Sequence, residues 1–165
     1  MIALPNECYY QIFNHLRCRD DYYRDLFSCI LVNRHWCRVF IPLLWSEPEQ
    51  HLKDIRLIRT SLLTLNTEEQ ALLIPFKNIL PNGPKPLFEY TSYITSINNY
   101  LYDGIGNWIL NEKYRIKCEL KNAIKCSLVA MFLRTSKNLK YLCIDEVICN
   151  RIIFENFCEN TMLLL

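Results

Sequence analysis

The chain has 165 residues, of which 51% are hydrophobic, 13% are aromatic and only three are glycine. This composition predicts a packed protein, either one domain of ordinary size or two small units, and it excludes an intrinsically disordered chain. The 19 basic and 17 acidic residues are interspersed, and the net charge is only +2. That balance gives no electrostatic footprint for nucleic acid, and no apolar run reaches the roughly 20 residues of a membrane-spanning helix. We therefore expect neither nucleic acid nor a membrane among the partners.

The nine cysteines form a high and odd count for a chain of this size. The N-terminus lacks the basic region and apolar core of a signal peptide, so a secreted disulfide scaffold is not expected. The cysteines lie inside apolar runs such as SCILV, KCSLVAMF and YLCI, where a free cysteine behaves as a small buried hydrophobe. The pattern indicates a reducing compartment, cytoplasmic or nuclear, with unpaired thiols.

The first expected element is a helix that begins near Pro5. Proline suits the first turn because its missing N–H is not needed there, and Glu7 lies near the positive end of the helix dipole. Apolar residues at positions 4, 8, 12 and 16, with 9 and 13 beside them, share one face. A short helix cannot bury such a face alone, so it packs on the following segments, on a partner, or on both. A three-helix core in which the helices cover only each other is the alternative that periodicity alone favours.

Two more apolar segments follow, one over residues 26–32 and one that carries Trp36, Phe40, Ile41 and Trp45. The sequence RCRDDYYRD between the first two segments is charged and holds two tyrosines, which predicts a solvated loop or an extra turn.

Taken together, residues 4 to 45 resemble the F-box, the short helical module that docks a substrate receptor onto a cullin-type ubiquitin ligase. The order and spacing of the residues carry the resemblance, and no single position is specific. The link after Leu16 is longer than is usual for the family. The matching positions are Leu4, Pro5, Glu7, Ile12, Phe13, Leu16, Leu26, Val32, Arg34, Trp36 and Trp45.

The resemblance implies that the protein is not an enzyme but the substrate-recognition adaptor of an SCF-type cullin–RING ubiquitin ligase. It would bind the Skp-type adaptor through its N-terminal helices and bring an unknown target to ubiquitin-dependent degradation. The residues expected to bind the adaptor are Leu4, Pro5, Ile12, Phe13 and Leu16. The residues expected to form the structural core of the box are Leu26, Val32, Trp36 and Trp45.

The middle of the chain continues with helical spacing over residues 48–65, with Pro48 in the first turn. Thr67 and Gln70 have the spacing of a capping box ahead of an apolar run, and Pro75 is expected to end that helix. The sequence LPNGPKPL that follows predicts a loop or an extended linker.

Residues 89–110 are rich in aromatics and predict one or two helices, broken around the sequence DGIGN. Residues 111–135 are again helical in pattern. The sequence EKYRIKCELKNAIK in this part is locally basic, but its lysines are expected to spread around a solvated helix face. The core candidates of this helix are Ala123, Ile124, Leu128, Phe132 and Leu133.

The last segment changes character, since Leu139, Leu142 and Ile144 follow the spacing L-x-x-L-x-I. That spacing resembles the strand of a leucine-rich repeat and predicts strand character over residues 140–144. A single helix–strand passage outside any repeat array is the alternative, because such repeats need several stacked copies to bury a core. The chain then ends at TMLLL, which suggests a shortened receptor.

The expected fold is therefore mainly α, with a three-helix F-box followed by helical segments and a short α/β unit similar to a leucine-rich repeat. The expected domains are the F-box over residues 1–46, a helical linker region over 47–120, and the start of a substrate-recognition region over 121–165. A helical scaffold or oligomerising domain with no ubiquitin-ligase link is the alternative function.

Enzyme and cofactor chemistry has no sequence support. His35 lies two residues from Cys37, and residues at that spacing face different ways on a helix, so this pair cannot readily act as base and nucleophile. Cys8, His15, Cys18 and Cys29 could be zinc ligands, but no C-x-x-C or H-x-x-x-H pair is present. Neither glycine-rich nucleotide-binding motif occurs. We expect no cofactor and no metal.

Overall fold

The computed structural model describes residues 5–19, 21–46, 48–76, 79–86 and 88–143. The chain divides into two compact units, unit 1 over Met1–Ser46 and unit 2 over Glu47–Leu165. The fold is mainly helical, as the sequence predicts. No helix among the described residues is both long enough and apolar enough to cross a membrane.

Unit 1 consists of three helices: α1 (Asn6–Arg17), α2 (Tyr22–Ile30) and α3 (Arg34–Ser46). Pro5 precedes α1 and Glu7 lies in its first turn, as expected. Of the two predictions for the charged sequence after Leu16, the extra turn is the one found, because α2 begins at Tyr22. The reason is packing: the ring of Tyr22 meets the ring of Phe13 edge-on, with the centroids 6.0 Å apart.

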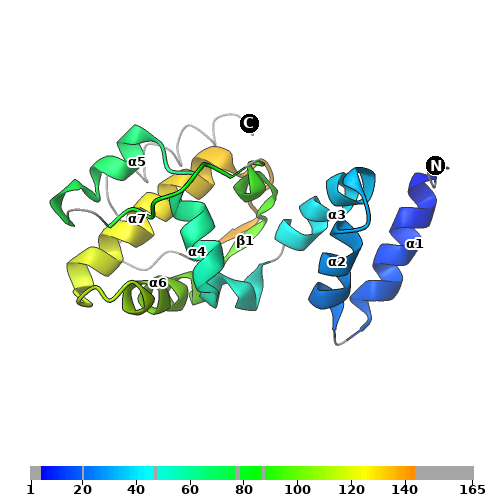
Figure 1. Ribbon diagram of the computed structural model, residues 1–165, viewed down its shortest axis with the longest axis horizontal. Coiled ribbons are helices and arrows are strands. Elements are labelled where there is room, and N and C mark those ends of the chain that lie inside the picture. Colours follow the sequence, from blue (N-terminus) through cyan, green and yellow to red (C-terminus); the bar gives the residue numbers. More distant parts are fainter. Residues whose placement is uncertain (1–4, 20, 47, 77–78, 87, 144–165) are drawn as a thin grey trace. The chain divides into compact units, whose positions relative to one another are not determined.

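The helices and strands of unit 2 are arranged around one central helix, α7, which Figure 1 shows among α4, α5 and α6. All ten residues from Ile124 to Leu133 are buried, and a helix that is apolar on most of its circumference must be covered on most sides. Four of the five predicted core residues are fully covered, and Ala123 is half-buried. The elements are η1 (Glu49–Lys53), α4 (Ile55–Leu62), α5 (Thr67–Ala71), η2 (Ile74–Phe76), η3 (Tyr90–Tyr93), β1 (Ser96–Ile97), α6 (Tyr100–Asn111), α7 (Cys118–Thr135) and β2 (Tyr141–Leu142).

The helix expected over residues 48–65 is interrupted at Asp54. The Asp54 carboxylate accepts a hydrogen bond from the backbone N–H of Arg56 at 2.8 Å, so a new helix, α4, begins there. The side chain of Arg56 also donates to this carboxylate, and these hydrogen bonds lower the pKa of Asp54. The cap therefore remains charged at neutral pH.

The capping box of α5 lies one residue earlier than the predicted pair, Thr67 and Gln70. The Asn66 side chain accepts from the backbone N–H of Glu69, and the Glu69 carboxylate accepts from the backbone N–H of Asn66, both at 2.8 Å. The helix ends at Ala71, before Pro75, which lies in η2.

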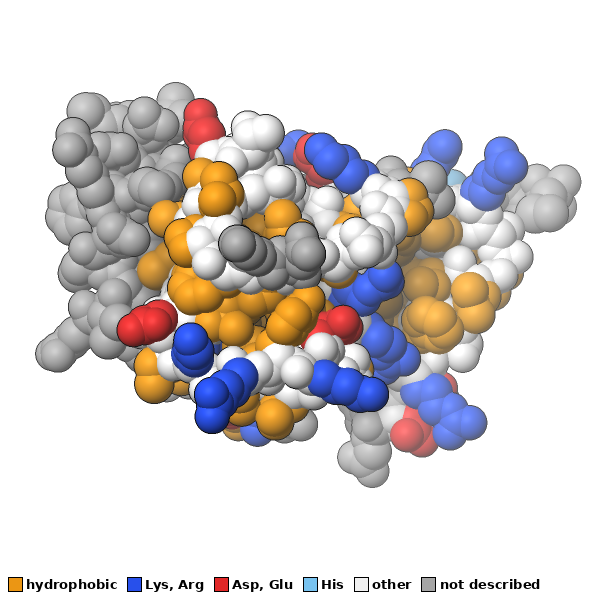
Figure 2. Space-filling model, turned by 60° about the vertical axis from the view of Figure 1, so that its left-hand side comes forward, with side chains coloured by type: hydrophobic (Ala, Val, Ile, Leu, Met, Phe, Trp, Pro, Cys, Tyr) orange, Lys and Arg blue, Asp and Glu red, His pale blue; other side chains and the backbone are white. Residues whose placement is uncertain are grey.

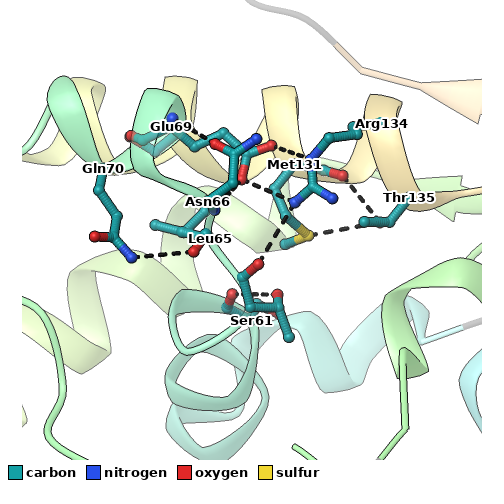
Figure 3. A network of polar contacts seen from close by, with 10 residues as sticks. Ser61, Leu65, Asn66, Glu69, Gln70, Met131, Arg134 and Thr135 are labelled. Atoms are coloured by element: carbon teal, nitrogen blue, oxygen red, sulfur yellow. Dashed lines mark hydrogen bonds and ion pairs between the residues drawn. The ribbon is translucent and has the colours of Figure 1, made fainter. Parts of the chain in front are cut away.

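The same Glu69 carboxylate is buried and joins α5 to α7. Arg134 donates to its two oxygens at 2.7 and 3.0 Å (Figure 3). The hydroxyl of Ser127 donates to the Glu69 carbonyl oxygen at 2.8 Å. The contact with the Glu69 carboxylate raises the pKa of Arg134 and holds its guanidinium charged. A five-residue helix has little stability of its own, so α5 depends on these contacts.

α6 is continuous through the sequence DGIGN, where a break is predicted. Gly104 is required there, because a Cβ atom at this position would lie 2.0 Å from the carbonyl oxygen of Leu52. The glycine therefore permits close packing of α6 on η1 rather than ending the helix.

The strand predicted over residues 140–144 is present as β2, and it pairs in parallel with β1 through Ser96 to Tyr141 and Ile97 to Leu142. The partner strand comes from the segment before α6, so the pairing closes a strand–helix–helix–strand unit within unit 2. The leucine-rich-repeat interpretation is not confirmed. Ile144 and the rest of the expected repeat lie outside the described residues.

Gly104→Ala should lower the free energy of unfolding of unit 2 by about 1–3 kcal/mol, because the new methyl group meets a rigid backbone carbonyl. Gly106→Ala is the matched control in the same helix, since its Cβ would meet only the mobile end of Lys121. This control should be neutral or stabilising by up to about 1 kcal/mol. Urea unfolding followed by tryptophan fluorescence measures both variants, with the same unfolding of Trp108→Phe protein subtracted to isolate the signal of unit 2. Equal effects would contradict the packing argument.

Arg134→Met should destabilise unit 2 by about 3 kcal/mol, because it leaves the buried Glu69 carboxylate without its counter-charge. Glu69→Gln should cost less, since the Arg134 side chain is 39% exposed and can turn to water. Arg56→Met, which removes the arginine of an exposed pair, is the control and should leave the unfolding midpoint nearly unchanged. Thermal unfolding monitored by circular dichroism gives the order of the three variants.

Candidate protein-binding surface

The core of unit 1 is small and largely aromatic. Tyr9 is buried and its ring meets Trp36 and Phe40 edge-on, at centroid distances of 5.7 and 6.2 Å. Leu16 and Leu26 complete the buried cluster. The half-buried residues packed around this cluster are Ile12, Phe13, Tyr22, Cys29, Ile30, Trp36, Val39, Leu43 and Leu44.

The turn between α2 and α3 is fixed by backbone and side-chain hydrogen bonds. The N–H groups of Leu31 and Val32 donate to the carbonyls of the last turn of α2, each at 3.2 Å. The Asn33 side chain then accepts from the backbone N–H groups of His35 and Trp36, at 2.9 and 3.0 Å, and so begins α3. This geometry holds Leu31 and Val32 at the end of the helix pair.

Among the described residues of unit 1, the exposed large hydrophobic side chains are Tyr10, on α1, and three side chains at this turn. Phe27 is 53% exposed, Leu31 70% and Val32 59%. Phe27 and Leu31 are four residues apart and are therefore neighbours on one face of α2, opposite the buried Leu26. We call these three residues the α2–α3 corner. Their grouping at one turn makes an apolar patch of the kind that marks protein-interaction sites.

The residues predicted to bind the adaptor have different positions in the structure. Pro5 is exposed, Ile12 and Phe13 are half-buried against the core, and Leu16 is buried within it. The apolar stripe of α1 thus packs on α2 and α3. Leu4 lies outside the described residues.

The residues predicted to be structural divide in a similar way. Leu26 is fully buried, and Trp36 and Trp45 are half-buried. Val32 is expected in the structural core, but it lies in the turn after α2, where its side chain is 59% exposed. That part of the prediction is corrected. The sequence signal for the α2–α3 corner is that positions 26, 27, 29, 30, 31 and 32 are all apolar, which is more than one helix face can bury.

Side chains that could bind a metal ion do not gather in the described part of the chain. No three of its His, Cys, Asp and Glu side chains are placed to hold a metal ion. Burial raises the pKa of the Cys29 thiol, with a contribution from the Asp25 carboxylate, and burial also raises the pKa of Cys126. Both thiols are protonated and weakly nucleophilic at neutral pH.

Unit 2 has a hollow of about 810 Å³ beside α5. Among the described residues that line it, none carries a carboxylate, imidazole, amine or thiol. The lining residues are Thr67, Gln70, Ala71, Leu73, Ile74, Ile79, Leu80 and Asn82.

Residues 1–51 match the family model described as F-box-like. Unit 1 is an F-box-like domain. The comparisons with curated proteins and with solved structures give no match to the chain. The family match covers the three helices and the beginning of unit 2. It therefore identifies the F-box-like domain and assigns no role to the rest of unit 2.

Leu26→Ala should destabilise the F-box-like domain by about 2–5 kcal/mol, because it opens a cavity in a small core. Val32→Ala should change its free energy of unfolding by less than about 0.5 kcal/mol, because that side chain is mostly in water. The fluorescence of Trp36 and Trp45 during denaturation reports on this domain, in Trp108→Phe protein that removes the signal of unit 2. A large loss of stability from Val32→Ala would show that its exposed position is wrong.

Proposed function

We propose that the protein is a substrate-recognition adaptor of an SCF-type cullin–RING ubiquitin ligase, with no catalytic activity of its own. The F-box-like match over residues 1–51 is the observation that carries this proposal. In this function the F-box-like domain binds a Skp-type adaptor, and unit 2 contributes to binding a target protein for degradation. The place of action is the cytoplasm or the nucleus.

The adaptor surface that we propose is centred on the α2–α3 corner and includes the N-terminal end at Leu4 and Pro5. Burying exposed apolar side chains drives most protein association, and Phe27 and Leu31 are both large apolar side chains that are more than half exposed. Ile12 and Phe13 contribute their accessible edges from α1. Leu16 supports the surface from within the core.

Phe27→Ala combined with Leu31→Ala should reduce co-purification with a Skp-type adaptor by at least about 30-fold. Anchor residues in interfaces each contribute about 2 kcal/mol or more, and both side chains are exposed in the free protein, so the fold should survive. Ile74→Ala combined with Leu110→Ala is the matched control, because it removes two comparably exposed aliphatic side chains from unit 2. Binding is measured by pull-down with purified adaptor and by calorimetry, and folding by circular dichroism.

The same variants also distinguish the proposed function from its alternative, a helical oligomerising domain. In that case the wild-type chain would form concentration-dependent oligomers in light scattering, the double variant at the α2–α3 corner would be monomeric, and neither would bind the adaptor. Leu4→Ala with Pro5→Ala tests the N-terminal end of the surface in the same assay. Adaptor binding that survives both double variants would rule out this surface.

A further inference from the structure

The turn between α6 and α7 carries three basic residues, Lys113, Arg115 and Lys117, and all three are exposed. We call this set the basic turn. The sequence predicts that these cations spread around a helix, but α6 ends at Asn111 and α7 begins only at Cys118. The structure instead gathers them on a short non-helical segment. Figure 2 shows one face on which Lys and Arg side chains reach outward beside hydrophobic ones.

The segment is held in place by its backbone and by one aromatic contact. The N–H of Lys113 donates to Leu110 O at 3.0 Å and the N–H of Tyr114 donates to Ile109 O at 3.1 Å, which together form a Schellman motif at the end of α6. The Tyr114 ring packs against the buried Trp108, with ring centroids 6.3 Å apart. Tyr114 thus faces inward, and its neighbours Lys113 and Arg115 project to solvent.

Lys113 occupies a position that favours glycine. Its φ is +60°, and among the described residues no other non-glycine residue has a positive φ. An ordinary side chain in this left-handed conformation costs about 1 kcal/mol relative to glycine. Lys113 is exposed despite this cost, so its charge is available to a partner outside the chain.

The basic turn also has no acidic partner, in contrast to four cations elsewhere in the described part of the chain. Arg19, Lys53, Arg56 and Arg134 each form a salt bridge within the described residues. In the same part of the chain, no carboxylate pairs with the side chains of the basic turn, although Glu112 and Glu119 are near in sequence. The neighbouring Lys121 likewise lies over the ring of Tyr102, at 3.6 Å, rather than beside an acid.

We propose that the basic turn is a docking surface for an extended acidic segment of another protein. The three exposed cations lie within five residues of one another, so a segment with several carboxylates close together in its sequence has complementary charge. Lys121 adds a fourth charge beside the turn. That this partner is the target of the ligase rests on the proposed function. Binding of an acidic segment at the basic turn does not require that function.

The test uses the full chain and a fluorescent 12-residue peptide of alternating Glu and Ser, with a Gln–Ser peptide as the uncharged probe. The Glu–Ser peptide should bind and should weaken as salt rises from 50 to 300 mM, because exposed charges are screened. Arg115→Gln with Lys117→Gln should weaken binding by about five- to twentyfold, since each exposed pair contributes about two- to fivefold. Lys85→Gln with Lys137→Gln is the control with the same loss of charge at exposed positions elsewhere in unit 2, and it should have little effect.

Lys113→Gly separates binding from folding. This variant should raise the unfolding midpoint of unit 2, because glycine adopts a positive φ without strain, and it should still weaken binding of the Glu–Ser peptide by about two- to fivefold. A destabilised Lys113→Gly protein, or one that binds with unchanged affinity, would overturn the argument from backbone strain.

Three results would overturn the proposal as a whole. The Gln–Ser peptide could bind as well as the Glu–Ser peptide, the control pair could weaken binding as much as the basic-turn pair, or a 12-nucleotide single-stranded RNA could compete through the same residues with higher affinity. Adaptor binding measured on the same variants is a separate readout. It should be unchanged by substitutions in the basic turn, so failure of this inference and failure of the proposed function are distinguishable.

Discussion

The burial of α7 on every side from Ile124 to Leu133 is the constraint around which unit 2 is built. A helix with no solvent-facing stripe must be surrounded, and the surrounding elements are too short to be stable alone. Polar contacts therefore fix their positions: Ser127 and Arg134 hold α5 through Glu69. The basic turn leads into this helix. The hollow lies beside α5, whose position depends on the contacts of Glu69.

The helices of unit 1 follow directly from the sequence, because proline, the acidic first turn and apolar spacing all act locally. Their exposed surface does not follow so easily. The apolar stripe of α1 could have faced a partner or α2 and α3, and periodicity is the same in both cases. The ring contacts of Tyr9 with Trp36 and Phe40 show that the stripe faces inward. Exposed apolar residues of this unit, such as Phe27 and Leu31, therefore lie outside the stripe.

In unit 2 the sequence predicts the helical character and the short strand, but it misplaces several boundaries. Glycine usually signals a break, yet Gly104 lies inside α6 because a carbonyl 52 residues earlier in the chain needs the space. Asn66 competes with Thr67 as a helix cap, and the burial of Glu69 against Arg134 decides between them. Each of these outcomes depends on a residue far away in the sequence. The same is true of β2, whose partner is known only once the helices between the strands have packed.

The aromatic core of unit 1 has a consequence for the lifetime of the protein in a cell. Its buried cluster comprises four side chains, far fewer than surround α7, and a 46-residue unit has little stability to spare. Unit 1 should therefore open locally before unit 2 does, and that open form is the one which proteases cleave. A partner that binds the closed form reduces the open population in proportion to its concentration. The abundance of the partner would then regulate how long the protein itself survives.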